Sequence, residues 1–293
     1  MSRRRNLERH RENLAEIRDI MNSMKTLAYM ETRKLARFLD SQHAVVRNIE
    51  EVAADLISFY PQSTATAKAA SPVYILIGTQ RGFCGDFNHS LLHHLEASMQ
   101  QHPPGGAPVL IGIGHRLCSL LENDARVAAT IENASVAEEV TSVLGRLVNE
   151  LSALQEQNRM LNLYGLYHGV EGGIVMQKIL PPFQQYLQKQ PLFPYPPALN
   201  ETPQQFLVKL TDHYLFAVLH EMLYTSLMAE NHQRMTHLDG AVKHLDDEST
   251  ELARRCNAMR QEEIIEEIEV ILLSAANLDQ DRPRRPEQKP GRV

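Results

Sequence analysis

Apolar residues recur at alternating spacings of three and four along the first sixty positions. One heptad series contains Leu14, Met21, Ala28, Leu35, Gln42, Ile49 and Leu56, and a second contains Ile17, Met24, Glu31, Phe38, Val45, Val52 and Phe59. Twelve of these fourteen positions are apolar, and residues 1–60 hold neither proline nor glycine. A 3.5-residue repeat of this length is typical of a coiled coil. The pattern therefore predicts a long N-terminal helix that needs a partner helix.

The same spacing returns near the C-terminus and supplies that partner. Its apolar positions are Leu207, Leu210, Tyr214, Ala217, Tyr224, Met228, Met235, Leu238, Val242, Leu245, Leu252, Cys256 and Met259. Gly240 inside this pattern costs about 1 kcal/mol relative to alanine, which is too little to end a well-patterned helix. Two such stripes in one chain predict an intramolecular antiparallel pair, with a homodimeric coiled coil as the alternative.

Beyond Met259 the apolar positions spread around the helix. They are Ile264, Ile265, Ile268, Val270, Ile271, Leu272, Leu273, Ala275, Ala276 and Leu278. A helix that is apolar on nearly all sides is normally enclosed, so we expect another protein to sheathe this tip. The charged, proline-containing residues 279–293 are predicted to form a disordered tail.

The middle of the chain changes to a pattern of buried strands. Strands are predicted at 73–78, 108–114, 127–131, 160–168 and 174–180, with amphipathic helices near 91–99 and 136–154. The sequence thus predicts a mixed α/β protein: a long antiparallel coiled coil of the N- and C-terminal helices (1–70 and 203–278) with an inserted Rossmann-like α/β domain (71–202).

The stretch VYILIGTQRGFCGDFN (73–88) is the strongest candidate for a ligand site. Gly78, Gly82 and Gly85 follow an apolar strand, as in many phosphate-binding turns. Their GxxxGxxG spacing matches neither GxGxxG nor GxxxxGK[ST], and no acidic residue ends the second predicted strand. We interpret the glycines as structural, and a stand-alone α/β nucleotide-binding protein with a coiled-coil arm is the alternative.

Other catalytic patterns are missing from the sequence. His89, His93 and His94 offer an HxxxH spacing, but a solvated helix face explains them. Cys84, Cys118 and Cys256 form no CxxC pair and are interpreted as small apolar side chains. With no GxSxG or HExxH motif either, we expect no enzymatic activity, no cofactor and no bound metal. A static scaffold is a third hypothesis.

Charge and hydropathy exclude further classes. Thirty Lys and Arg against 36 Asp and Glu give a net charge of -6, which disfavours binding to nucleic acid. The arginine-rich start lacks the apolar run of a secretory signal, and no stretch approaches 18 uninterrupted apolar residues. We expect neither export nor a membrane span.

Three stretches resemble the gamma subunit family of F-type rotary ATP synthases. They are IRDIMNSMKTLAYMETRKLAR (17–37), GTQRGFCGDFN (78–88), and the closing pair SLMAENHQRMTHLDGAVKH (226–244) with MRQEEIIEEIEVILLSAANL (259–278). The resemblance implies a central rotor shaft in a ring of three alpha and three beta subunits, next to the epsilon subunit and the membrane c-ring. It also implies a peripheral position on the cytoplasmic face of the plasma membrane.

The resemblance further implies roles for particular residues. Arg260 and Gln261 match a pair that binds a catch loop of beta, and a basic group matches the stretch that faces the acidic lever of beta. That basic group is Lys25, Arg33, Lys34 and Arg37. The family's turn is structural and binds no nucleotide, and its matching positions are Gly78, Arg81, Gly82, Cys84, Gly85 and Asn88.

Several departures from the family pattern stand out. Asp86 replaces the second glycine of the turn, and Ser274-Ala275-Ala276 replaces Ser-Gly-Ala. Glutamate is also enriched after Arg260, at positions 262, 263, 266, 267 and 269. These differences predict a divergent, alternate-type bacterial or archaeal lineage, and they leave the coupling ion, proton or sodium, open.

Overall fold

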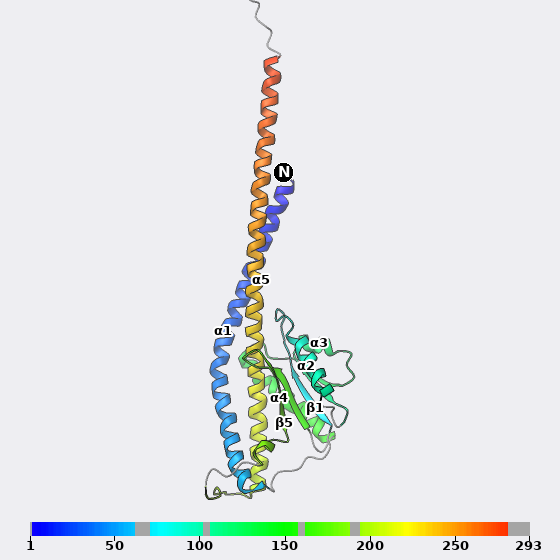
Figure 1. Ribbon diagram of the computed structural model, residues 1–293, viewed down its shortest axis with the longest axis vertical. Helices are drawn as coiled ribbons and strands as arrows, with labels where there is room; N and C mark the ends of the chain where they lie inside the picture. Colours follow the sequence, from blue (N-terminus) through cyan, green and yellow to red (C-terminus); the bar gives the residue numbers. More distant parts are fainter. Residues whose placement is uncertain (1, 62–70, 102–105, 158–161, 188–193, 281–293) are drawn as a thin grey trace, which may run out of the picture. The chain divides into compact units, whose positions relative to one another are not determined.

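The computed structural model describes residues 2–61, 71–101, 106–157, 162–187 and 194–280 (Figure 1). The helices are α1 (Ser2–Phe59), α2 (Phe87–Gln101), α3 (His115–Leu121), α4 (Val140–Gln157) and α5 (Pro203–Gln280), with short 3-10 turns at η2 (Ala137–Glu139) and η3 (Gln184–Tyr186). The strands are β1 (Pro72–Ile77), β2 (Val109–Ile113), β3 (Val127–Ile131), β4 (Asn162–His168) and β5 (Ile174–Leu180). The described chain forms two compact units, one of residues 23–239 and one of the helix ends up to 22 and from 240.

In the unit of the helix ends, α1 and α5 run antiparallel. Ion pairs join Arg4 to Glu263 at 3.3 Å and Arg18 to Asp246 at 2.6 Å, so the residue numbers rise on one helix as they fall on the other. Exposed pairs of this kind each contribute about 0–1 kcal/mol, so they set register more than they stabilise.

The larger unit repeats the antiparallel arrangement. Lys25 Nζ lies 3.0 Å from Asp239 Oδ1, and the ring of Phe38 stacks on that of Tyr224 with centroids 5.5 Å apart. The predicted intramolecular helix pair is therefore confirmed within each unit. The second helix ends at Gln280, two residues later than predicted, and the rest of the predicted tail lies outside the described residues.

The buried face of α1 differs from the predicted one. The first heptad series is largely correct, since Leu14, Ala28, Leu35 and Leu56 are buried. The second series is wrong at Ile17, Phe38, Val45 and Val52, which are all exposed. In their place the chain buries Leu39, Val46 and Ala53, each one position later. An α-helix has 3.6 residues per turn, so its buried face drifts from a 3.5-residue repeat when the helix also packs on another layer.

The α/β part of the larger unit is a five-stranded sheet in the order β3-β2-β1-β4-β5. The first four strands are parallel and β5 is antiparallel to β4. All six residues of β1 are buried, as expected for a central parallel strand. The predicted strands are confirmed to within one residue at each end, except that residues 160 and 161 of the predicted 160–168 strand lie outside the described residues. The short helix α3 was not predicted.

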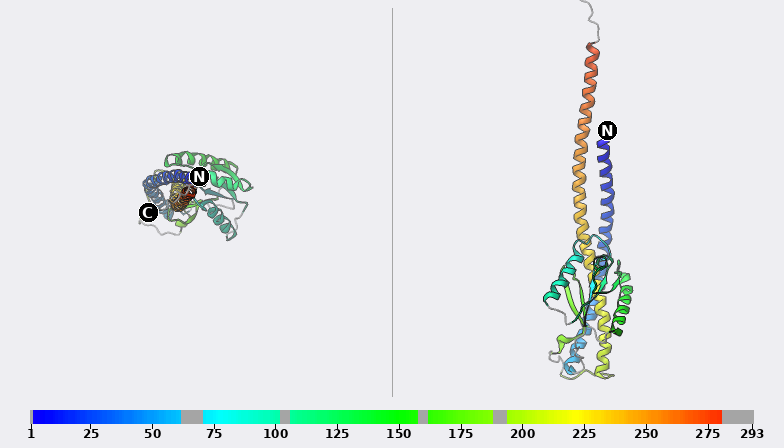
Figure 2. Two further views of the ribbon diagram at one scale, coloured as in Figure 1. Left: turned by 90° about the horizontal axis from the view of Figure 1, so that it is seen from above. Right: turned by 90° about the vertical axis from the view of Figure 1, so that its right-hand side faces the viewer.

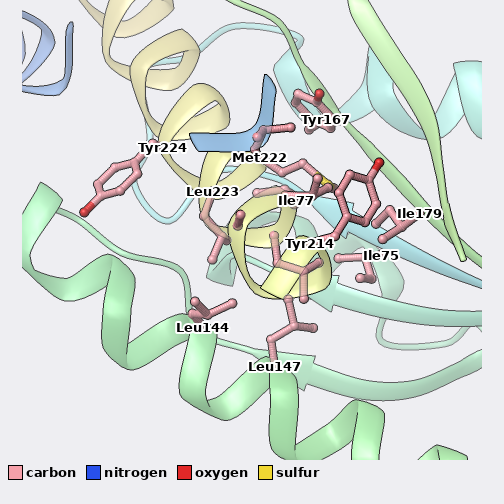
Figure 3. Packing of buried hydrophobic residues seen from close by; sticks show 14 of the residues in the cluster. Ile75, Ile77, Leu144, Leu147, Tyr167, Ile179, Tyr214, Met222, Leu223 and Tyr224 are labelled. Atoms are coloured by element: carbon pink, nitrogen blue, oxygen red, sulfur yellow. The ribbon is translucent and has the colours of Figure 1, made fainter. Parts of the chain in front are cut away.

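Helices cover both faces of the sheet (Figure 1, Figure 2). On one face, Ile75 and Ile77 of β1 pack with α4 and α5, where Leu147 and Met222 contribute (Figure 3). On the other face, Leu76 packs with α2 and α3. Burial of one such side chain contributes about 1.5–3 kcal/mol. Because α5 belongs to both the sheet's core and the helix pair, it fixes the turn after β1 against its own surface.

Candidate functional site

The glycine turn (residues 78–88) leaves the carboxyl end of β1. The Thr79 amide N–H donates to Asn88 Oδ1 at 3.0 Å, and Asn88 Nδ2 donates to Thr79 Oγ1 at 2.9 Å. On the sheet side, the Gly78 N–H donates to the Ile113 carbonyl at 2.8 Å. Asn88 thus closes the turn from within, which accounts for an asparagine at this position.

A buried carboxylate from α5 reaches the middle of the turn. The backbone N–H groups of Gln80 and Arg81 each donate to Glu230 at 3.4 Å, and Glu230 also forms an ion pair with Arg234. Arg234 in turn donates through Nε to the Gly82 carbonyl at 3.2 Å and through Nη1 to Asn231 Oδ1 at 2.9 Å. One carboxylate and one guanidinium therefore hold the turn on α5.

Burial governs the energetics of this pair. The side chains of Glu230 and Arg234 are only 2% and 6% exposed. Burial raises the pKa of Glu230, whereas Arg234 and the two backbone donors oppose that rise by favouring the ionised carboxylate. Removing one partner of a buried ion pair typically costs about 3–5 kcal/mol, because the other charge stays buried and unpaired.

The hydrogen bonds from the turn to Glu230 disfavour the hypothesis that the turn binds a nucleotide. In a phosphate-binding turn, consecutive backbone N–H groups point at the ligand's anionic oxygens. Here the N–H groups of Gln80 and Arg81 point at the protein's own carboxylate. Glu230 and Arg234 were not among the predicted site residues, although a Glu and an Arg four residues apart in a long helix are a usable signal of an ion pair.

Cys84 and Gly85 have structural explanations. The Cys84 side chain is buried, and burial raises the pKa of its thiol to about 12, which disfavours the reactive thiolate. Gly85 has φ +58°, and a Cβ placed there would lie 2.1 Å from His237 Nε2. Only glycine fits this position without displacing the histidine on α5.

The four predicted basic residues of α1 have different surroundings. Lys25 pairs with Asp239 at 3.0 Å, and Lys34 pairs with Glu138, which raises the pKa of Lys34 and lowers that of Glu138. Arg33 lies over the Tyr29 ring at 5.9 Å, a cation–π distance. Arg33 and Arg37 are exposed. Two of the four cations thus already have an anionic partner within the chain.

Arg260 and Gln261 are consecutive exposed residues of α5 in the unit of the helix ends. The acidic-apolar segment (residues 262–273) follows directly. Its large apolar side chains are 46–66% exposed, and they are Ile264, Ile265, Ile268, Val270, Ile271, Leu272 and Leu273. This exposure agrees with the prediction that a partner sheathes the tip.

The apolar cover of this segment is less complete than predicted. At 3.6 residues per turn, one side of the helix carries Ile264, Ile265, Ile268, Ile271 and Leu272. The opposite side carries Glu262, Glu263, Glu266, Glu267 and Glu269. Only Val270 and Leu273 interrupt the acidic side. The segment is therefore amphipathic, with charge on one side and aliphatic surface on the other.

The histidines do not assemble a metal site in the described part of the chain. His89, His93 and His94 are exposed on α2, and no group of three potential ligands occurs among the described residues. A pocket of about 350 Å³ is lined by His94, His168, His232 and Asp86, among others. His168 Nε2 lies 2.9 Å from the Phe87 carbonyl, and its ring stacks on Phe87.

The helices of the described chain include none that is long and apolar enough to cross a membrane.

Solved structures similar to this chain share its fold. A chain of the Euglena gracilis mitochondrial ATP synthase, from an OSCP/F1/c-ring structure in rotational state 3, matches with a TM-score of 0.61 and 16% identity, covering 98% of this chain and 99% of that one. A chain from the central stalk/c-ring of the Tetrahymena thermophila mitochondrial ATP synthase matches with a TM-score of 0.53 and 16% identity, covering 76% and 99%.

Curated relatives carry one common description. An ATP synthase gamma chain of Clostridium botulinum (strain Langeland / NCTC 10281 / Type F) is 21% identical over 271 residues, covering 91% of this chain and 95% of the relative. That of Clostridium beijerinckii (strain ATCC 51743 / NCIMB 8052) is 25% identical over 280 residues, covering 88% and 92%. The ATP synthase family itself matches residues 3–278. Since this match spans nearly the whole chain, the protein belongs to the ATP synthase family, among its gamma chains.

Proposed function

We propose that this chain is the non-catalytic central rotor shaft of an F-type ATP synthase. It couples ion translocation through the membrane sector to ATP synthesis or hydrolysis at the beta subunits. The observation that carries the proposal is the family match over residues 3–278 on an antiparallel pair of long helices with an inserted α/β sheet. A helix pair of this kind suits torque transmission, because each helix restrains bending of the other.

The partners follow from this role. Three alpha and three beta subunits surround the helix ends, and the α/β sheet lies near the epsilon subunit and the c-ring. The exposed aliphatic side chains of the acidic-apolar segment support an enclosing protein partner, because water contact with so much apolar surface is unfavourable. The complex is placed on the cytoplasmic face of the plasma membrane, with this chain peripheral.

Within this role the glycine turn is structural and binds no nucleotide. Gly78, Arg81, Gly82, Cys84, Gly85 and Asn88 form its framework. Support comes from the Glu230 carboxylate, which accepts hydrogen bonds from the Gln80 and Arg81 N–H groups that a phosphate would otherwise need. The turn then serves to fix the sheet rigidly to α5, so that the two move as one body.

Contacts with the beta subunits are assigned to two groups. Arg260 and Gln261 reach a catch loop of beta, which their exposure on α5 permits. Lys25, Arg33, Lys34 and Arg37 face the acidic lever of beta. Arg33 and Arg37 are exposed, so each can pair with a carboxylate of beta. Lys25 and Lys34 already pair with Asp239 and Glu138, so a carboxylate of beta would compete with these internal partners.

Coexpression with the alpha and beta subunits of the same organism tests the proposal. The chain should copurify at one copy per ring, and sustained ATP hydrolysis should require it. The purified chain alone should hydrolyse no ATP. A ring that works equally well without the chain, or a dinucleotide that raises the melting temperature of the isolated chain, would contradict the rotor assignment.

A further inference from the structure

The acidic-apolar segment carries glutamates on one side of the helix and aliphatic residues on the other, and the rotor role alone does not require this arrangement. A shaft in a purely apolar sleeve needs only aliphatic side chains. Here, five glutamates occupy one side of the helix over eight residues, opposite Ile264, Ile268 and Leu272. An apolar wall that closed over both sides would bury several carboxylates without partners, at a large desolvation cost.

One of the glutamates is satisfied within the chain. Glu263 forms an ion pair with Arg4 of α1 at 3.3 Å. Glu262, Glu266, Glu267 and Glu269 are exposed and have no ion pair with any described residue. Within the described part of the chain, the intramolecular pairing of the acidic side is therefore limited to Glu263, and we take the other four carboxylates as candidates for contact with another chain.

A shallow hollow on this helix is lined by both acidic and aliphatic side chains. Glu263, Glu266, Glu267, Val270 and Ile271 line it together, so carboxylates and aliphatic side chains meet within about two turns. Lysine and arginine have an aliphatic stem and a charged head, and they bury the stem on apolar surface while the head reaches a charge. Such a side chain can contact Val270 and Ile271 and still pair with Glu266 or Glu267.

We propose that the acidic-apolar segment docks into a sleeve of the alpha and beta subunits whose wall carries lysine or arginine side chains opposite these glutamates. This inference rests on the proposed rotor function and specifies the chemistry of its partner surface. In a ring with three repeats, the one acidic side of the helix meets the equivalent basic positions in turn during a revolution. The contact is then charged on one side and aliphatic on the other at every angle.

The test measures how tightly the chain binds the ring of alpha and beta subunits at two salt concentrations. The variant E266Q/E267Q/E269Q removes three carboxylates without changing side-chain size. The matched control E122Q/E150Q/E156Q removes three exposed glutamates from the α/β part, so that both variants change the net charge equally. All three proteins should unfold at similar temperatures, because the altered side chains are exposed.

We expect the segment variant to bind about tenfold more weakly at 0.1 M salt and within about twofold of wild type at 1 M, where the screening length falls from roughly 10 Å to 3 Å. The control should match wild type at both concentrations. The charge-reversing variant E266K/E267K/E269K should bind more weakly still, because it places like charges opposite each other.

Two outcomes would overturn the inference while leaving the rotor function intact. In the first, the wild type binds the ring and sustains hydrolysis, but the segment variant binds with the same affinity and salt dependence. In the second, deletion of residues 281–293, which hold Arg282, Arg284 and Arg285, removes the difference between variant and wild type. The chain's own C-terminal residues would then be the partner. A wild type that does not bind the ring at all contradicts the rotor function itself.

Discussion

The glycine turn and the acidic-apolar segment differ in where their charged side chains lie: those that hold the turn are buried, and most of those in the segment are exposed. In the turn, Glu230 and Arg234 are nearly inaccessible to water, and each has several hydrogen-bond partners inside the chain. In the segment, Glu262, Glu266, Glu267 and Glu269 are exposed next to exposed isoleucines, whereas Glu263 is partly covered and pairs with Arg4. Polar groups that are satisfied internally serve the fold. Unpaired charges next to exposed aliphatic surface are suited to a partner.

The turn and the segment should therefore respond differently to substitution. Substitutions in the turn should change the stability of the isolated chain. Those in the segment should leave it unchanged and alter assembly with the alpha and beta subunits.

The largest effect is expected for E230A. It removes the carboxylate that pairs with Arg234 and accepts two backbone N–H groups, so the free energy of unfolding should fall by about 3–5 kcal/mol. Urea unfolding of the isolated chain measures this loss of free energy. The double variant E230M/R234M leaves no buried charge, so its loss should be clearly smaller than the summed losses of E230A and R234A. Additive losses would mean that the pair is not a coupled unit.

A smaller loss is expected for G85A. The left-handed backbone costs about 1–2 kcal/mol for a residue with a Cβ, and the new methyl group would displace His237. Thermal or urea unfolding should show a loss of roughly this size or more. A second variant, G85A/H237A, tests the cause: it should recover only the steric part. Full recovery would show that backbone strain contributes nothing.

A gain of about 0.5–1 kcal/mol is expected for G240A. Gly240 lies inside α5, and a Cβ there meets nothing within 4 Å, so alanine restricts the unfolded chain without a clash. The same unfolding measurements apply. A loss of stability would mean that this position needs glycine for a reason the packing does not show.

The smallest effect on the isolated chain is expected for I264S/I268S/L272S. These side chains are about half exposed, so the stability of the chain alone should stay within about 0.5 kcal/mol of wild type. Copurification with the ring should nevertheless fall markedly, because the aliphatic contact with the sleeve is lost. A large drop in the stability of the isolated chain would show that the segment packs within the chain.

The pH dependence of stability provides a further contrast between buried and exposed groups. Burial lowers the pKa of His168, so the folded state binds fewer protons than the unfolded state below the ordinary histidine pKa of about 6.5. Stability is therefore fully present above that pH and is lost as the pH falls through the folded-state pKa. H168N should reduce the loss between pH 7.5 and 5.5. The variant H89N is the matched control, and an equal reduction of the loss in H89N and H168N would refute the assignment.

The sequence by itself determined the two long helices, the five strands and their order along the chain, but not the short helix α3. The 3,4 spacing of apolar residues predicted both long helices, because only a helix brings such positions onto one face. The short apolar runs at 73–78 and 174–180 predicted strands through their length and their flanking Gly and Pro residues. The family resemblance rested on local stretches such as GTQRGFCGDFN. The family match over residues 3–278 confirmed this resemblance.

Tertiary structure decided which side chains meet. Heptad counting chose Phe38, Val45 and Val52 for the buried face, but the additional layer formed by the sheet and α4 buries Leu39, Val46 and Ala53. Glu230 lies about 150 positions after the turn that it holds, and no local pattern specifies a contact across that separation. Periodicity is a property of neighbouring residues, so the sequence could predict it. Partnership between distant residues depends on the packed fold, so only the structure could show that the glycine turn is held by a carboxylate of α5.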